Sequence, residues 1–107
     1  MNDTVQSLLA ELKTRLVELY GQRIKGVYLF GSYAREEADR ESDLDVLIVL
    51  DDVPNYTAEI QRTSELVSEV SLRWGISVTR VFASERRWRE DQTLFFLNVR
   101  EEALPIL

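Results

Sequence analysis

Residues 25–50 read KGVYLFGSYAREEADRESDLDVLIVL, and this stretch decides the fold. It begins with a short run rich in β-branched and aromatic residues, which predicts a strand that ends at a Gly31-Ser32 turn. The next residues, 33–38, suit a helix. Residues 43–50 then form a second strand, whose last five residues are apolar without interruption, as in a sheet covered on both faces. The stretch therefore predicts a layered domain in which helices cover a sheet.

Two carboxylates, Asp43 and Asp45, open the second predicted strand. Asp is disfavoured in strands, so a pair at the start of the most hydrophobic strand needs a functional reason. Because side chains alternate along a strand, the two acids point to one face with their Cα atoms about 7 Å apart. Such a pair can bind Mg²⁺, which prefers oxygen ligands. Gly31 permits a sharp turn, and Ser32 can cap a helix or bind a phosphate.

The spacing of these groups resembles a known signature. Gly31-Ser32, ten further residues and Asp43-Leu44-Asp45 are similar to the motif of the polymerase β-type nucleotidyltransferase superfamily. The short chain resembles the minimal nucleotidyltransferase (MNT) branch, the MntA-like antitoxins of HEPN/MNT toxin–antitoxin systems. The resemblance implies an α/β (α+β) fold with a small mixed β-sheet flanked by helices. It also implies that Gly31 and Ser32 bind the triphosphate of ATP, and that Asp43 and Asp45 are catalytic and hold Mg²⁺.

Arg35 is a further candidate for nucleotide binding. It follows Ser32 by one turn of the predicted helix, where it could reach a phosphate or pair with Asp39 four residues on.

The chain departs from the superfamily at a third carboxylate, which complete members carry on a later strand. Ser77 or Thr79 stands at the corresponding place, and neither can be a carboxylate base or a charged ligand. Two acids can still bind Mg²⁺, because this ion keeps several waters and uses substrate phosphates as ligands. We therefore expect either a slower, more partner-dependent catalyst or a site that has lost its activity.

The resemblance implies an antitoxin that transfers AMP from Mg²⁺-ATP to a hydroxyl, most plausibly a tyrosine, of a HEPN ribonuclease toxin. So small a chain has little surface for recognising an acceptor alone, which favours a stable hetero-oligomer with the toxin. One alternative is a non-catalytic antitoxin that neutralises the toxin by binding and occlusion. A more remote one is a small-molecule nucleotidyltransferase, which would normally need an added substrate domain.

Composition narrows the remaining choices. At 107 residues, 45% of them hydrophobic, the chain suits a single domain over residues 1–107. The net charge of −6 argues against a nucleic-acid backbone as the main partner. Cysteine and histidine are absent, which excludes disulfides and an imidazole base. No apolar run approaches the roughly 20 residues of a membrane span, and we expect a cytoplasmic protein.

The rest of the chain divides into recognisable elements. We predict a first helix that ends at about residue 20, helices at about residues 56–74 and 93–103, and a strand at 76–83. Asn2 or Asp3 can cap the first helix, and Gly21 and Gly75 can end the first two. The first helix has an apolar stripe, which comprises Val5, Leu8, Leu9, Leu12, Leu16 and Leu19. The second is expected to bury Ile60, Val67 and either Val70 or Ser71.

The arginine cluster and three aromatic residues each allow more than one interpretation. Arg86-Arg87-Trp88-Arg89 is either a partner or nucleotide surface, or a solvated turn balanced by Glu85, Glu90 and Asp91. Three aromatic residues could stack on an adenine, and the sequence does not choose among Tyr33, Trp74 and Trp88.

Overall fold

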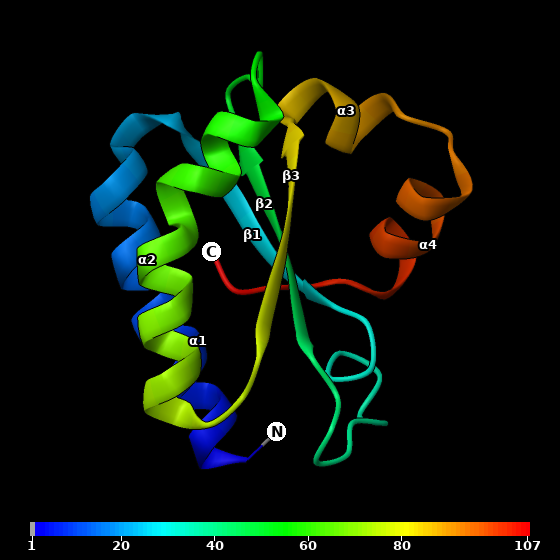
Figure 1. Ribbon diagram of the computed structural model, residues 1–107. Coiled ribbons are helices and arrows are strands. Elements are labelled where there is room, and N and C mark those ends of the chain that lie inside the picture. Colours follow the sequence, from blue (N-terminus) through cyan, green and yellow to red (C-terminus); the bar gives the residue numbers. More distant parts are fainter. Residues whose placement is uncertain (1) are drawn as a thin grey trace.

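A mixed sheet with helices on both faces organises the computed structural model, which describes residues 2–107 (Figure 1). The elements are α1 (Asp3–Tyr20), the 3-10 helix η1 (Gly21–Arg23), β1 (Ile24–Phe30), β2 (Leu44–Leu50), α2 (Tyr56–Trp74), β3 (Val78–Ser84), α3 (Glu85–Glu90), α4 (Leu94–Glu102) and β4 (Leu104–Pro105). The described strands lie in the order β3-β2-β1-β4. β2 and β3 are parallel, whereas β1 is antiparallel to both of its neighbours. The predicted small mixed sheet flanked by helices is confirmed.

The two faces of the sheet have separate cores. α1 and α2 cover one face, and α3 and α4 lie on the other side (Figure 1). Because side chains alternate along β2, Val46 and Ile48 pack toward α1 and α2, while Leu47 and Val49 pack toward α4. Within the described residues, no helix is long and apolar enough to cross a bilayer.

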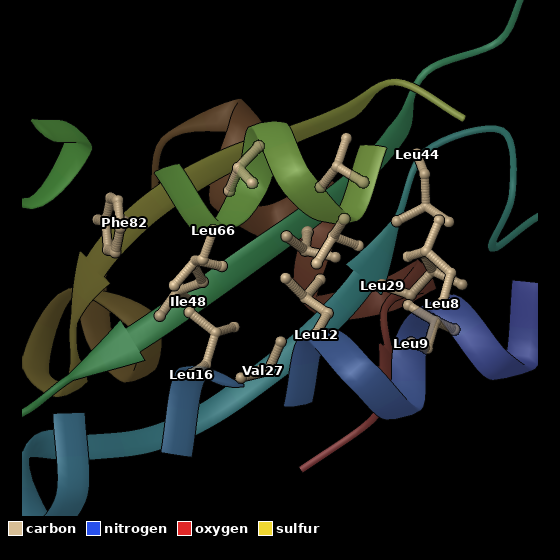
Figure 2. Packing of buried hydrophobic residues seen from close by; sticks show 14 of the residues in the cluster. Leu8, Leu9, Leu12, Leu16, Val27, Leu29, Leu44, Ile48, Leu66 and Phe82 are labelled. Atoms are coloured by element: carbon tan, nitrogen blue, oxygen red, sulfur yellow. The ribbon is translucent and has the colours of Figure 1, made fainter. Parts of the chain in front are cut away.

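The first helix follows its predicted stripe except at its end. Its leucines point at β1 and β2, as Figure 2 shows for Leu8, Leu12 and Leu16. Leu19 was predicted to join them, but 40% of its surface is exposed, and Tyr20 is buried instead. Tyr20 lies four residues after Leu16, so it continues the same helical face. Asn2 is the N-cap residue, and the C-cap is Gly21, as predicted.

The second helix buries more polar groups than its sequence suggested. Val67 and Val70 are buried and Ile60 is partly buried, as expected, but Glu59 and Thr63 are buried as well. Glu59 accepts hydrogen bonds from the Tyr20 hydroxyl (2.8 Å) and the Arg23 guanidinium (3.0 Å). Burial acts to raise the pKa of Glu59, but these donors outweigh it and the pKa is lowered. The paired carboxylate ties α1 to α2.

The predicted helix at residues 33–38 is wrong. The chain makes a single turn after Gly31, in which Glu37 N–H donates to the Ser32 carbonyl (2.9 Å). Glu36 has a left-handed backbone (φ 59°), which ends any helical progression. Six residues without an apolar stripe do not repay the cost of nucleating a helix. As a result, Ser32 has no helix to cap.

The C-terminal part contains two elements that the sequence analysis did not predict. Residues 85–90 form the helix α3, with Ser84 as its N-cap. β4 follows α4 and pairs with Tyr28 and Leu29 of β1. The predicted helix at 93–103 is confirmed as α4, and it ends before Pro105. The strand predicted at 76–83 is β3, displaced toward its C-terminal side.

Candidate active site

The predicted site residues converge at one end of the strands, where β1 ends and β2 and β3 begin (Figure 1). Asp45 lies opposite Phe30 of β1 on one side and opposite Thr79 of β3 on the other. Gly31 directly follows Phe30, so the turn begins beside Asp45. The structure thus brings together residues that are distant in the sequence, as the motif predicted.

Gly31 fits its position for two separate reasons. Its φ of +77° lies in the left-handed region, which glycine adopts readily. A Cβ atom at this position would lie 2.3 Å from the Asp45 carboxylate oxygen Oδ2. The turn and the carboxylate are therefore packed so closely that no side chain fits between them.

Asp43 and Asp45 lie on either side of the buried Leu44. Leu44 packs into the core under α1 and α2, and its N–H donates to the Ser77 carbonyl (2.8 Å). Asp43 is exposed just before β2, and Asp45 is partly buried within the strand. By strand alternation, Asp45 shares a face with Leu47 and Val49, the face toward α4.

Thr79 occupies the place nearest Asp45 on β3. Its hydroxyl donates a hydrogen bond to Asp45 Oδ1. Of the two positions considered for the missing third carboxylate, Thr79 is therefore the one that contacts the acidic pair. The contact fixes the orientation of Asp45 and leaves Oδ2 on the side of Gly31.

Asp43 and Asp45 are the candidate ligands for a metal ion. Residues 2–107 contain no cluster of three or more carboxylate, imidazole or thiolate groups arranged to hold an ion. One exposed carboxylate, Asp43, and one partly buried carboxylate, Asp45, nevertheless suit Mg²⁺, because this ion binds through one or two carboxylates and completes its shell with water and phosphate. Asp43 and Asp45 are thus compatible with an ion that arrives together with a nucleotide.

Ser32 and Arg35 lie on the turn after Gly31. The Ser32 hydroxyl makes no side-chain hydrogen bond within the described part of the chain, so it is available to a ligand. Of the two alternatives for Arg35, the pair with Asp39 does not form. Arg35 donates to Glu102 Oε2 (3.0 Å) and Glu37 Oε2 (3.3 Å), and these carboxylates, Glu102 first, raise the pKa of Arg35.

The arginine cluster forms ion pairs along α3. Arg86 pairs with Glu90 and Arg87 with Asp91, each at 3.0 Å and four residues apart. The solvated interpretation therefore has a structural basis, although the segment is a helix and not a turn. The pKa of Asp91 falls to about 2, mainly because the Thr93 backbone N–H donates to it.

The three candidate aromatic residues differ in their surroundings. Trp88 stacks on Tyr28, with ring centroids 4.4 Å apart. Trp74 donates its Nε1–H to Glu11 (3.1 Å). Tyr33 lies on the turn itself and lines a cavity of about 220 Å³. Trp74 and Trp88 are thus held by structural contacts away from the turn, and of the three candidates only Tyr33 lies on the turn that follows Gly31.

Sequence reasoning missed Glu102. This last residue of α4 accepts a hydrogen bond from the Gly31 N–H (3.1 Å), although 71 residues separate them. No local pattern marks it, since it is one of several acids near the end of the chain. Only the packing of α4 over the sheet brings it to the turn.

The chain is similar in sequence to proteins of known name. MJ0604 of Methanocaldococcus jannaschii, named as a candidate protein adenylyltransferase, is 32% identical over 98 residues, which cover 91% of this chain and 92% of that protein. The protein adenylyltransferase MntA of Thermococcus cleftensis is 35% identical over 71 residues, covering 66% of this chain and 70% of that protein.

Among solved structures, an MNT antitoxin in complex with a tri-AMPylated Shewanella oneidensis HEPN toxin has a similar fold. That match has a TM-score of 0.63 at 18% identity, and it covers 95% of this chain and 71% of the solved chain. A toxin–antitoxin structure with AMP-PNP matches with a TM-score of 0.66 at 20% identity, covering 92% and 72%. The family model described as "Nucleotidyltransferase domain" matches residues 9–101. Because that match spans most of the sequence, the chain belongs to the nucleotidyltransferase domain family.

Proposed function

We propose that this protein transfers AMP from Mg²⁺-ATP to a tyrosine hydroxyl of a HEPN ribonuclease toxin and thereby neutralises it. The observation that carries the proposal is the packing of the Asp45 carboxylate directly against the Gly31 turn, next to Ser32. Nucleotidyl transfer needs carboxylates that hold a metal ion and, next to them, hydrogen-bond donors that position the phosphates. The names of the relatives, protein adenylyltransferase and MntA, support the same reaction.

Each site residue has a role in this proposal. The Gly31 N–H, the Ser32 hydroxyl and the Arg35 guanidinium bind phosphate oxygens, since all three are hydrogen-bond donors beside the turn. Asp43 and Asp45 would hold Mg²⁺, which when bound neutralises charge that develops on the phosphate oxygens. Thr79 keeps Asp45 in one orientation through its hydroxyl.

The reaction is a substitution at the α-phosphorus of ATP. The acceptor oxygen forms a bond to this phosphorus, the bond to the bridging oxygen breaks, and pyrophosphate leaves. The proton of the acceptor hydroxyl passes to solvent water, because Thr79 provides no carboxylate base at the position where the superfamily has one. We expect slower transfer than a three-carboxylate site would give.

The test combines the protein, Mg²⁺-ATP and the HEPN ribonuclease encoded beside it. Intact mass should show AMP added to the toxin by the wild type and none by Asp43→Asn/Asp45→Asn. The matched control is Asp51→Asn/Asp52→Asn, which removes the same charge at the other end of β2 and should keep transfer. Thermal unfolding verifies that each variant is folded. Equal transfer by the wild type and the first double variant would remove Asp43 and Asp45 from the mechanism.

Occlusion without chemistry is the second candidate, and the threonine at position 79 favours it. A covalent change persists after the antitoxin is removed, whereas occlusion reverses on dissociation. The toxin should therefore be separated from the antitoxin and assayed again for ribonuclease activity. Recovery of activity, together with full neutralisation by Asp43→Asn/Asp45→Asn at a stoichiometric ratio, would establish the occluding antitoxin.

A further inference from the structure

Glu102 holds two of the groups that the proposed function assigns to phosphate. Its Oε1 accepts from the Gly31 N–H at 3.1 Å, and its Oε2 accepts from Arg35 Nη1 at 3.0 Å. The Glu102 side chain is three-quarters buried, with 25% of its surface exposed. One carboxylate thus bridges the turn and the arginine beside it.

The position of Glu102 in its helix makes these contacts informative. It is the last residue of α4, where the helix dipole disfavours a negative charge. A carboxylate at a helix C-terminus therefore gains its stability from partners outside the helix, here the Gly31 amide and Arg35. Glu101, its neighbour in the same last turn, is exposed.

A backbone N–H and a guanidinium that together hold a carboxylate can also hold a phosphate oxygen. Both ligands are anionic oxygen acceptors with charge-assisted hydrogen bonds of similar length. The Gly31 N–H carries a single hydrogen, so it cannot serve Glu102 and a triphosphate at once, and two anions held by the same guanidinium repel each other. Binding a nucleotide at the turn therefore requires the Glu102 carboxylate to leave.

We infer that Glu102 is an affinity-determining residue that occupies the phosphate-binding donors and is displaced when a nucleoside triphosphate binds. The inference rests on the proposed function, since it concerns the same turn. Arg35 exchanges Glu102 for a phosphate oxygen, while its second partner, Glu37, keeps the guanidinium near the turn. Glu102 thus lowers the affinity for nucleotide without taking part in the transfer.

The test measures dissociation constants for Mg²⁺-ATP and for Mg²⁺-tripolyphosphate by titration calorimetry. Glu102→Ala should bind both about tenfold more tightly than the wild type, the scale of one charge-assisted hydrogen bond that no longer has to be broken. Glu102→Gln keeps the size of the side chain but loses the ion pair, and it should also bind more tightly. Glu101→Ala is the matched control and should bind as the wild type does.

Three results would overturn the inference and leave the proposed function standing. Unchanged binding by both Glu102 variants, with thermal unfolding showing that they are folded, would make the contact purely structural. Weaker binding would make Glu102 part of the nucleotide site. A loss of kcat without a fall in the KM for ATP would place Glu102 in the catalytic step. If neither the wild type nor any variant binds Mg²⁺-ATP, the proposed function fails as well, so the two failures are distinguishable.

Discussion

Replacing Gly31 with alanine separates the backbone requirement of the turn from its contact with the acidic pair. Gly31 and Gly75 have similar positive φ values, +77° and +69°. An added Cβ at Gly31 would meet Asp45 Oδ2 at 2.3 Å, whereas at Gly75 it would meet nothing within 4 Å. Gly75→Ala therefore introduces backbone strain without a steric clash, which makes it a matched control for Gly31→Ala.

The magnitudes follow from these contacts. Left-handed backbone strain costs alanine about 1–2 kcal/mol, and both variants should lose this much unfolding free energy. Gly31→Ala must in addition rotate the Asp45 carboxylate away, which breaks its hydrogen bond from Thr79. A hydrogen bond to a charged group contributes roughly 1.5–3 kcal/mol, so Gly31→Ala should be less stable than Gly75→Ala by about that amount.

Urea unfolding gives the free energies, and the intact mass of the toxin gives AMP transfer. Gly31→Ala should transfer no AMP, and Gly75→Ala should transfer it at the wild-type rate. In an Asp45→Ala background the extra cost of Gly31→Ala should vanish, because the Asp45 Cβ lies at an ordinary 3.5 Å. Equal stability losses for the two glycine variants, or transfer by Gly31→Ala, would refute the claim that the turn and the carboxylate are packed together.

Further predictions concern Tyr20, Thr79 and Asp91. Tyr20→Phe removes a donor to the buried Glu59 and should lower the urea unfolding free energy by about 1–2 kcal/mol; an unchanged midpoint would contradict this. Thr79→Val should slow AMP transfer and should also lower the urea unfolding free energy by roughly 1.5–3 kcal/mol, because Asp45 loses the hydrogen bond that orients it. Thr79→Asp should lower the Mg²⁺ concentration needed for half-maximal transfer, because it adds a carboxylate, and a titration of transfer with Mg²⁺ tests both variants. Asp91 has its pKa lowered from 3.8 to about 2, so its contribution to stability is present above about pH 4 and is lost as the pH falls toward 2. The melting temperature of Asp91→Asn should therefore fall less than that of the wild type between about pH 4 and pH 2. If the two proteins lose stability equally over this range, the role given to Asp91 is wrong.

Local sequence signals predicted what depends on neighbours in the chain. The helices at 3–20 and 56–74 were predictable because their apolar periodicity and capping residues agree. The strand at 43–50 was predictable from its apolar run. Residues 33–38 have helix-forming composition, but they form one turn, in which Arg35 pairs with Glu102 of a distant helix. Tertiary contacts override a propensity summed over so few residues.

The candidate site divides in the same way. Gly31, Ser32, Asp43 and Asp45 stand at a fixed spacing, so a motif can represent them. The choice of Thr79 over Ser77 needed the register of β2 and β3, which sequence spacing alone left open by two residues. Glu102 comes to the turn only through the packing of α4, and no sequence pattern encodes that distance.

The edges of the sheet limit how this protein can join another chain. On the outer side of β3, the Phe82 N–H donates to the Tyr56 hydroxyl (3.2 Å) and the Val78 N–H donates to the Ser71 hydroxyl (3.1 Å). Side chains of α2 thus bind two backbone N–H groups that an added strand would need. At the other edge, β4 is two residues long and contains Pro105, which has no N–H to offer. Both edges thus resist the addition of a further strand. A partner must be recognised through the side chains of helices and turns, and strand-by-strand aggregation has no ready template.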